Sequence, residues 1–267
     1  MLYGFYKNYS YICKMRSIRN DIIDLGIFDT ITLDEMKDIR LMNRIDTKFV
    51  TTIPVLCKLL EMAKEEYRIQ ETCGKRILEY YTLYFDTPAH DMYISHQNGK
   101  KPRQKIRVRS YVDSNLSFLE VKNKFANGRT KKKRISISDK SQWNSPDSLD
   151  FLAERSRYDV SIIRPQIENS FSRITLVNRA LSERITIDVN LKFHNIENDA
   201  RLEMTDYVII ELKRDGNKTS QINKFLLDLR VKPSRFSKYC VGCAKTDPGL
   251  KQNRFKPLFT YLNKLLQ

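Results

Sequence analysis

The chain lacks a long hydrophobic run. Its first residues, MLYGFYKNYSYICKMR, contain several aromatic side chains but are interrupted by Lys7, Asn8 and Lys14, so they do not form the continuous apolar core of a signal peptide. No apolar stretch approaches the roughly 20 residues that a membrane-spanning helix needs. We therefore expect a soluble, cytoplasmic protein without a transmembrane segment.

Cysteine is scarce and unevenly placed. The five cysteines stand at positions 13, 57, 73, 240 and 243. An odd, scattered set argues against a disulfide framework and indicates a reducing compartment. Cys240 and Cys243 form a single CxxC, but a structural zinc site needs four ligands and no second pair or nearby histidine is present. Two half-buried thiols without a metal are the simpler interpretation.

Negative charge is in short supply. Among 267 residues there are 48 Lys and Arg against 32 Asp and Glu, a net charge of +16. Such an excess favours a polyanionic partner such as nucleic acid, anionic lipid or phosphates. We found no internal repeat and no low-complexity linker, so one main domain is expected over residues 29–252. Residues 1–28 are predicted to be a leader, and residues 253–267 a C-terminal amphipathic helix.

Short strands joined by turns dominate the predicted secondary structure. Strands are expected at 44–50, 77–86, 105–112, 118–124, 131–137, 183–191 and 207–213, with an Asn127-Gly128 turn in one hairpin. A capping box of Thr32 and Glu35 predicts a helix to about residue 43, and Pro54 opens another with Leu56, Leu59, Leu60 and Ala63 apolar. Further helices are expected at 148–158, 219–229 and 255–266. This pattern predicts an α+β fold in which an antiparallel sheet or barrel is flanked by helices.

Several of these strands have one apolar and one ionic face, because side chains alternate along a strand. In 105–112 the ionic face carries Lys105, Arg107 and Arg109, and in 118–124 it carries Glu120, Lys122 and Lys124. In 184–191, Ile185, Ile187, Val189 and Leu191 oppose Arg184, Thr186, Asp188 and Asn190; in 207–213, Val208, Ile210 and Leu212 oppose Glu211 and Lys213.

The sign of the charge is the informative feature of these faces. Residues 100–134 hold 13 Lys and Arg against only Asp113 and Glu120. A face that is merely solvated usually mixes signs to avoid self-repulsion, although an ordinary sheet with one face in water stays a possible interpretation for any single strand. A row of cations is better explained by a partner anion that carries several charges.

Two geometries would present such a row. An open basic sheet would suit a nucleic-acid backbone, but stacking aromatics should then interleave with the cations, and the basic strands contain only Tyr111, Phe118 and Phe125. Strands closed into a barrel would instead direct the ionic faces inward, where a lowered dielectric strengthens phosphate binding. Acids among the cations, namely Glu211, Glu120 and Asp188, would then be ligands of a hard divalent ion or partners in internal salt bridges.

An ordered series of motifs resembles a known family. The segments RIDTKF, YYTLYFDT, KIRVRSY, FLEVKNK, KKKR, RITIDVN, VIIELK and FSKY occur in this order between about residues 29 and 245. Together they resemble the polyphosphate polymerase (VTC) domain of the CYTH-like triphosphate tunnel metalloenzyme superfamily. The resemblance implies an antiparallel tunnel barrel with a basic lumen, which binds ATP and a growing inorganic polyphosphate chain and uses Mn²⁺ or Mg²⁺.

The resemblance also implies roles for individual residues. Residues implied to act in catalysis are Lys48, Arg107, Arg109, Lys122, Lys133, Arg173, Arg184 and Lys238, with Lys132 or Arg134 as alternatives to Lys133 in the KKKR run. Further phosphate-binding candidates are Arg44, Lys105, Lys124, Arg134, Lys213 and Ser237, and the metal candidates are Glu211 and Glu120. One departure concerns Phe171, which stands where the family often has a tyrosine, so a phosphate-contacting hydroxyl is missing.

Three functions remain open at this stage. The first is a polyphosphate polymerase that transfers the ATP γ-phosphate to a polyphosphate chain. The second is an inorganic or nucleoside triphosphatase that uses the same tunnel with water as the acceptor. The third is a non-catalytic binder of polyphosphate or another polyanion, and we do not expect nucleic acid to be its physiological ligand because aromatics are few on the cationic strands.

Overall fold

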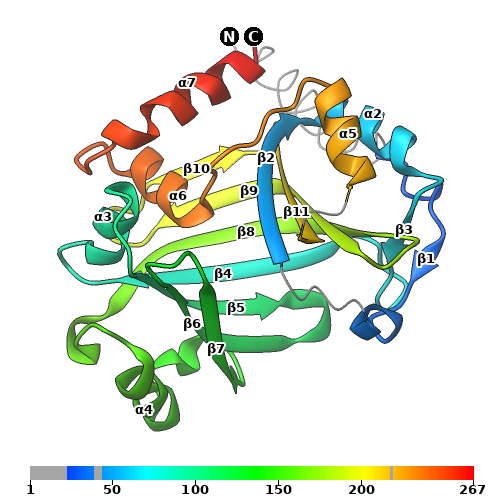
Figure 1. Cartoon of the computed structure of the whole chain (residues 1–267). Helices are drawn as coiled ribbons and strands as arrows, with labels where there is room; N and C mark the ends of the chain where they lie inside the picture. The colour runs from blue at the N-terminus through cyan, green and yellow to red at the C-terminus, as the bar shows by residue number, and fades with distance from the viewer. Residues whose placement is uncertain (1–22, 39–43, 217–218) are drawn as a thin grey trace, which may run out of the picture.

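A computed structural model describes residues 23–38, 44–216 and 219–267 (Figure 1). Its centre is an eleven-stranded sheet with the main strand order β2-β11-β9-β8-β4-β5-β6-β7. All pairings along this path are antiparallel, whereas the short β1 pairs with β3 in parallel. The strands are β1 (Thr30–Ile31), β2 (Arg44–Thr52), β3 (Tyr67–Gln70), β4 (Leu78–Asp86), β5 (Arg103–Tyr111), β6 (Leu116–Lys124), β7 (Thr130–Ile137), β8 (Arg164–Asn178), β9 (Glu183–Asn195), β10 (Arg201–Met204) and β11 (Tyr207–Asp215).

The predicted fold class, an antiparallel β barrel with flanking helices, is confirmed, although the sheet is not closed by hydrogen bonds. β2 and β7 stand at the two ends of the strand order and do not pair with each other within the described residues. In Figure 1 both lie in front of the middle strands, so the sheet curls. The free edge of β2 is partly covered by the 233–234 segment, where the Ser234 amide donates to the Lys48 carbonyl at 2.7 Å.

Helices flank the curled sheet. They are α2 (Ile53–Ala63), α3 (Asp91–Gln97), α4 (Pro146–Arg155), α5 (Gln221–Asp228), α6 (Lys238–Thr246) and α7 (Lys256–Leu265). α2 buries Leu56, Leu59, Leu60 and Ala63 as predicted, in one core cluster with Ile210 and Ile222 of β11 and α5. The second cluster combines the outer face of β5 and β6 with α4, through Val108, Leu119 and Leu152.

α6 occupies a different place, at one end of the inner face. Its buried side chains contact β8 and β9, and a Cβ added at Gly242 would lie 2.7 Å from Ile167 Cδ1 and Phe193 Cδ1. A β-bulge lies in this part of the sheet. The register between β8 and β9 shifts between Ser170 and Ser172, and Asn190 on β9 has a φ of +55°. The prediction that Leu191 shares a face with Val189 was therefore wrong, since the extra residue turns Leu191 toward α6.

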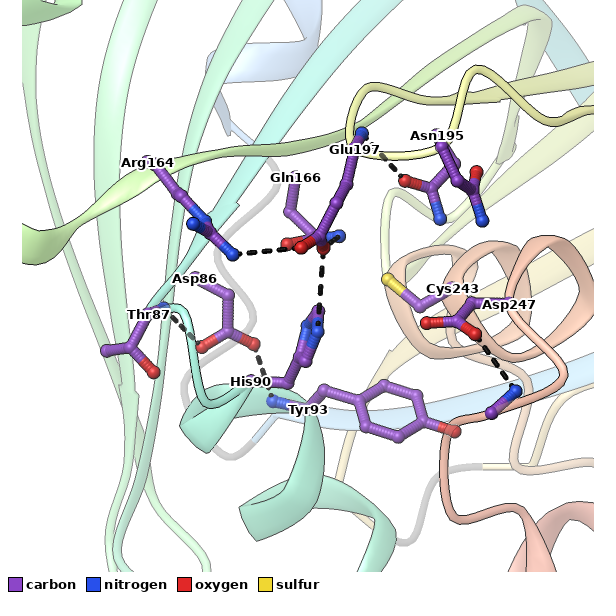
Figure 2. Close-up of polar contacts among 12 residues, drawn as sticks. Asp86, Thr87, His90, Tyr93, Arg164, Gln166, Asn195, Glu197, Cys243 and Asp247 are labelled. Carbon is purple, nitrogen blue, oxygen red and sulfur yellow. Dashed lines mark hydrogen bonds and ion pairs between the residues drawn. The ribbon is translucent and has the colours of Figure 1, made fainter.

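Polar contacts hold α3 and α6 at this end (Figure 2). The buried Asp86 carboxylate accepts hydrogen bonds from the backbone amides of Thr87 at 2.8 Å and Tyr93 at 2.9 Å, and also from the Tyr239 hydroxyl of α6. Burial raises the pKa of Asp86, while these donors oppose the shift. Nearby, Glu197 accepts from Arg164 at 3.0 Å and lies 3.6 Å from His90. The carboxylates thus fix the start of α3 and orient α6 against the sheet.

The remaining predicted elements show smaller differences. Thr32 and Glu35 form the predicted capping box, with the Glu35 carboxylate accepting from the Thr32 amide at 2.8 Å, but the helix is a short 3-10 turn over Glu35–Asp38. Residues 39–43 and most of the predicted leader lie outside the described residues, while Leu25 and Phe28 are buried in the core. α3, α6 and the 15-residue strand β8 were not predicted. No helix in the described parts is long and apolar enough to cross a membrane.

Candidate active site

The ionic faces of the strands gather on one side of the sheet, which we call the inner face. Backbone register places Lys48 opposite Glu211, and Glu120 opposite both Arg107 and Arg134, so these side chains share that face. The inner-face cations are Arg44, Lys48, Arg103, Lys105, Arg107, Arg109, Lys122, Lys124, Lys132, Arg134, Arg173, Arg184 and Lys213, and Lys238 of α6 joins them.

Electrostatic coupling shows that the two ends of the sheet face each other. Burial lowers the pKa of Lys122 on β6 to about 7, together with the charges of Arg107 and of Lys48 on the distant strand β2. Burial likewise lowers the pKa of Lys105 to about 8, and Lys48 adds to that shift. Lys48 acts on both lysines only because the curl brings β2 close to β5 and β6. The inner face is thus a crowded set of cations that repel one another.

Glu120, one of the two predicted metal ligands, is fully engaged by cations. Its side chain is 1% exposed, with one carboxylate oxygen 2.7 Å from Arg107 Nη2 and the other 2.7 Å from Lys132 Nζ. Burial alone would raise its pKa, but Arg107, Arg109 and Lys132 lower it to about 2. Because both oxygens are occupied by cations, Glu120 is better placed to orient Arg107 than to bind a metal ion.

Asp188, the other acid considered from sequence, forms a buried ion-pair group. Arg173 donates from Nε at 2.6 Å and from Nη2 at 2.9 Å to its two oxygens, and Lys238 of α6 also donates to it. Burial would raise the pKa of Asp188, yet Arg173 and Lys238 hold it well below its usual range. Asp188 therefore fixes two cations from different elements at one point of the inner face.

Glu211 differs from the other two carboxylates. Its oxygens lie 4.0 Å from Lys48 Nζ and 3.6 Å from Lys213 Nζ, beyond hydrogen-bond distance, and its side chain is 21% exposed. Burial favours the neutral acid, but Lys48 and Lys213 lower its pKa well below the usual range and keep it charged. The described residues hold no group of three or more His, Cys, Asp or Glu side chains around a common point. Glu211 can thus offer a divalent cation one carboxylate, and the ion's remaining ligands would be phosphate oxygens and water.

Two arginines keep donors without a protein partner. Arg109 Nε and Arg184 Nε are buried and have no hydrogen-bond acceptor among the described residues. Burial lowers the pKa of Arg109, and the neighbouring Arg107 and Arg173 lower it further. A buried donor without an acceptor is costly, so both guanidinium groups are suited to an anion from outside the chain.

The structure brings nearly all of the predicted phosphate-binding residues together, with one exception. Lys133 pairs with Val121 and therefore lies on the outer face of β7, whereas Lys132 and Arg134 lie on the inner face. Ser237 accepts a hydrogen bond from Lys105 Nζ at 2.9 Å and caps α6 through the Cys240 amide at 3.3 Å. Cys240 and Cys243, predicted as partly buried thiols, are both 0% exposed within α6, and burial raises the pKa of each.

Sequence reasoning missed Arg103, and it weighed Lys132 only as an alternative. Arg103 precedes Lys105 by two residues and so continues the same alternation, a signal that was available. The stacked pair of Tyr80 and Phe171 on the inner face was missed as well. Tyr80 stacks on Phe171 at a ring distance of 5.2 Å, and the Arg173 guanidinium lies 4.7 Å from the Tyr80 ring.

Comparisons with solved structures give remote likenesses. A nominal adenylate cyclase from Bacillus halodurans is 13% identical, with 80% of this chain and 97% of that chain covered and a TM-score of 0.48. A nominal adenylyl cyclase from Hippeastrum, described as having a dominant triphosphatase activity, is 12% identical over 76% of this chain and 97% of that one, with a TM-score of 0.44. At this level of identity and overlap, the likeness says nothing of the chain's activity. No curated protein sequence matches.

The family assignment rests on a match that covers most of the sequence. A model of the VTC domain family matches residues 43–246, which include the entire ionic series from Lys48 to Lys238. The match confirms the resemblance inferred from the ordered motifs, and it covers more than half of the chain. The chain belongs to the VTC domain family.

Proposed function

We propose that the inner face binds the triphosphate of ATP and transfers its γ-phosphate to a growing inorganic polyphosphate chain. The observation that carries this proposal is the set of mutually repelling inner-face cations, among which Arg109 Nε and Arg184 Nε are buried without an acceptor. A multiply charged phosphate chain would relieve the repulsion and fill these donors at the same time.

Phosphoryl transfer depends mainly on positioning and on neutralising charge, so a covalent protein nucleophile is not required. Glu120 holds Arg107 through Nε at 2.8 Å and Nη2 at 2.7 Å, so the guanidinium keeps a fixed orientation on the inner face. Together with Arg109 and Lys122 it would hold the β- and γ-phosphates. Glu120 acts as a positioning residue that keeps the Arg107 fork in a fixed orientation.

A second group of cations suits the acceptor chain. Asp188 fixes Arg173 and Lys238. Arg184 lies nearby: burial lowers the pKa of Arg184, and the charges of Arg44 and then Arg173 lower it further. With Lys48 these residues would align the end of a polyphosphate chain for in-line attack on the γ-phosphorus. Both chains would approach through the same basic face, which fits an acceptor that is itself a polyanion.

A divalent cation such as Mn²⁺ or Mg²⁺ fits at Glu211, whose oxygens lie beyond hydrogen-bond distance of Lys48 and Lys213. When bound, it would supply additional positive charge to the phosphate oxygens. Lys48 and Lys213 hold the pKa of Glu211 low, so its carboxylate stays ionised and available as a ligand at neutral pH.

Product sizing tests the proposal. The purified protein is incubated with ATP and Mn²⁺, and the products are separated by length. Phosphate chains longer than the substrate support a polymerase; free phosphate without chain growth would overturn it in favour of a triphosphatase. Salt-sensitive binding to polyphosphate with no ATP consumption would overturn both enzymes in favour of a polyanion binder.

The Glu211→Gln variant tests the metal assignment. It should lose metal-dependent turnover while its far-UV circular dichroism spectrum stays that of the folded wild type. Glu154→Gln on α4, where the side chain is 63% exposed, is the matched control and should keep full activity. Turnover that survives in Glu211→Gln would refute Glu211 as the metal ligand.

A further inference from the structure

An aromatic group borders the cations at one end of the inner face. Tyr80 and Tyr111 lie with their ring centres 5.1 Å apart, and Tyr111 meets Phe118 edge-on at 5.9 Å and 89°. Tyr80 is only 8% exposed and packs on Phe171, which is 1% exposed. Tyr111 and Phe118 are only partly buried. Two rings thus remain accessible beside the phosphate site, and one of them, Tyr111, contacts the buried Tyr80.

These rings continue the row of charged side chains. Tyr111 follows Arg109 in the alternation of β5, and Phe118 precedes Glu120 in that of β6. Backbone register places Phe118 opposite Arg109 on one side and Ser136 on the other. The Arg134 guanidinium lies 4.2 Å from the centre of the Phe118 ring, so the cation and the ring already form a stacked pair.

The spacing along β6 fits a nucleotide that lies parallel to the strand. Phe118 and Lys122 are four residues apart, or about 13 Å at 3.3 Å per residue. That length is comparable to an extended nucleoside triphosphate measured from its base to its γ-phosphate. Glu120 lies between the two ends with Arg107 opposite it, and Arg109 with its unpartnered Nε lies opposite Phe118.

We propose that Tyr111 and Phe118, together with Arg134, form a stacking platform for the base of the nucleoside triphosphate. The inference rests on the proposed function, because it assumes that the adjoining cations bind the triphosphate. The platform would hold the base at the end of the inner face and direct the phosphates toward Arg107 and Lys122. Aromatic side chains and arginine both stack on bases without reading their hydrogen-bonding edges.

This chemistry sets the expected specificity. The side chain opposite Phe118 on β7 is Ser136, a single hydroxyl that can donate or accept and so does not select one base edge. The preference among bases should therefore depend on stacking strength. Purine nucleotides should bind better than pyrimidine nucleotides, and ATP and GTP should bind with nearly equal affinity. Inorganic tripolyphosphate, which has no base, should bind independently of the platform.

The test compares two ligands on matched variants. Binding of a non-hydrolysable ATP analogue and of inorganic tripolyphosphate is measured by calorimetry for the wild type and for Phe118→Leu and Tyr111→Leu. Base stacking contributes about 1–3 kcal/mol, so each variant should weaken the ATP analogue at least about fivefold. Tripolyphosphate affinity should change less than about twofold. Phe125→Leu, whose side chain is 37% exposed at the β6–β7 turn, is the control and should change neither ligand.

The outcomes separate the platform from the proposed function. Equal losses for both ligands, or no loss for the ATP analogue, would overturn the platform and leave the rings as packing only. Loss confined to the ATP analogue supports the platform even if product sizing shows that the protein does not lengthen polyphosphate. A wild-type protein that binds tripolyphosphate but not the ATP analogue would also overturn it, whatever the reaction.

Discussion

Asp188 offers the sharpest test of how the inner face is held together. Its side chain is 5% exposed, and those of its partners Arg173 and Lys238 are 12% and 11% exposed. Asp188→Asn keeps the size of the side chain but removes its charge. Two buried cations would then lack a counter-charge, and the new amide group would direct donors toward the Arg173 guanidinium.

The expected loss of stability is large for a substitution that replaces one oxygen atom by an amide nitrogen. Removing one partner of a buried ion pair costs about 3–5 kcal/mol, because the remaining charge stays buried. At about 2–4 °C per kcal/mol for a domain of this size, the melting temperature should fall by roughly 6–20 °C. Asp150→Asn on α4, which replaces an exposed aspartate, should change stability by less than about 0.5 kcal/mol and serves as the control.

The pH dependence of the difference gives an independent check. Burial alone would raise the pKa of Asp188, but Arg173 and Lys238 hold it far below the value of about 3.9 in an unfolded chain. The stabilisation is therefore fully present above about pH 4 to 5 and is lost as the pH falls further, when the folded carboxylate is protonated. The difference in the free energy of unfolding between the wild type and Asp188→Asn should thus become smaller at acidic pH.

Thermal and urea unfolding followed by circular dichroism measure both effects. Inorganic tripolyphosphate should reduce the gap at pH 7, since a bound anion would neutralise Arg173 and Lys238 in place of Asp188. A stability loss below 1 kcal/mol at pH 7, or a gap that does not change on acidification, would refute the account of a buried, charge-balanced group.

Three further predictions concern the same face. Ligand-free protein should become more stable between pH 7 and 9, because the folded-state pKa values of four lysines lie below their unfolded value and the unfolded chain then binds more protons; these lysines are Lys105, Lys122, Lys213 and Lys238. A melting temperature that falls over this range would contradict it. Lys122→Met should raise the melting temperature of the ligand-free protein and weaken tripolyphosphate binding. A lower melting temperature together with weaker binding would mean that Lys122 is not repelled by its neighbours. Gly242→Ala should cost about 1–3 kcal/mol by overpacking against Ile167 and Phe193, and an unchanged unfolding curve would show that α6 can move away.

The ionic half of the fold could be predicted because it depends on local alternation. Strand side chains repeat every two residues, so Arg107 and Glu120 could be assigned to a common face before any pairing was known. The KKKR run shows the limit of that reasoning. Four consecutive cations put two on each face whatever the register, and only pairing with β6 shows that Lys132 and Arg134, not Lys133, face inward.

The elements that were missed lack such a period. α6 buries nearly every side chain from Tyr239 to Ala244, so it has no polar face to reveal a helical repeat. β8 is apolar on opposite faces at its two ends, since Ile167 and Phe171 pack in the cluster with α6, whereas Ile174 and Leu176 pack in the cluster with α2. A single alternating pattern cannot describe a strand whose buried face changes along its length.

Three of the inner-face acids, Glu120, Asp188 and Glu211, show why composition alone could not assign a metal ligand. Each is a carboxylate among cations, and each has a lowered pKa, so sequence and charge treat them alike. Distance separates them: Glu120 and Asp188 are bonded to cations at hydrogen-bond distance, while the cations around Glu211 stay at 3.6 Å or more. Glu120 and Asp188 therefore serve to orient arginines, and removing either acid should destabilise the fold or misplace the arginine that it holds. The third keeps its oxygens available for a ligand that the chain itself does not supply.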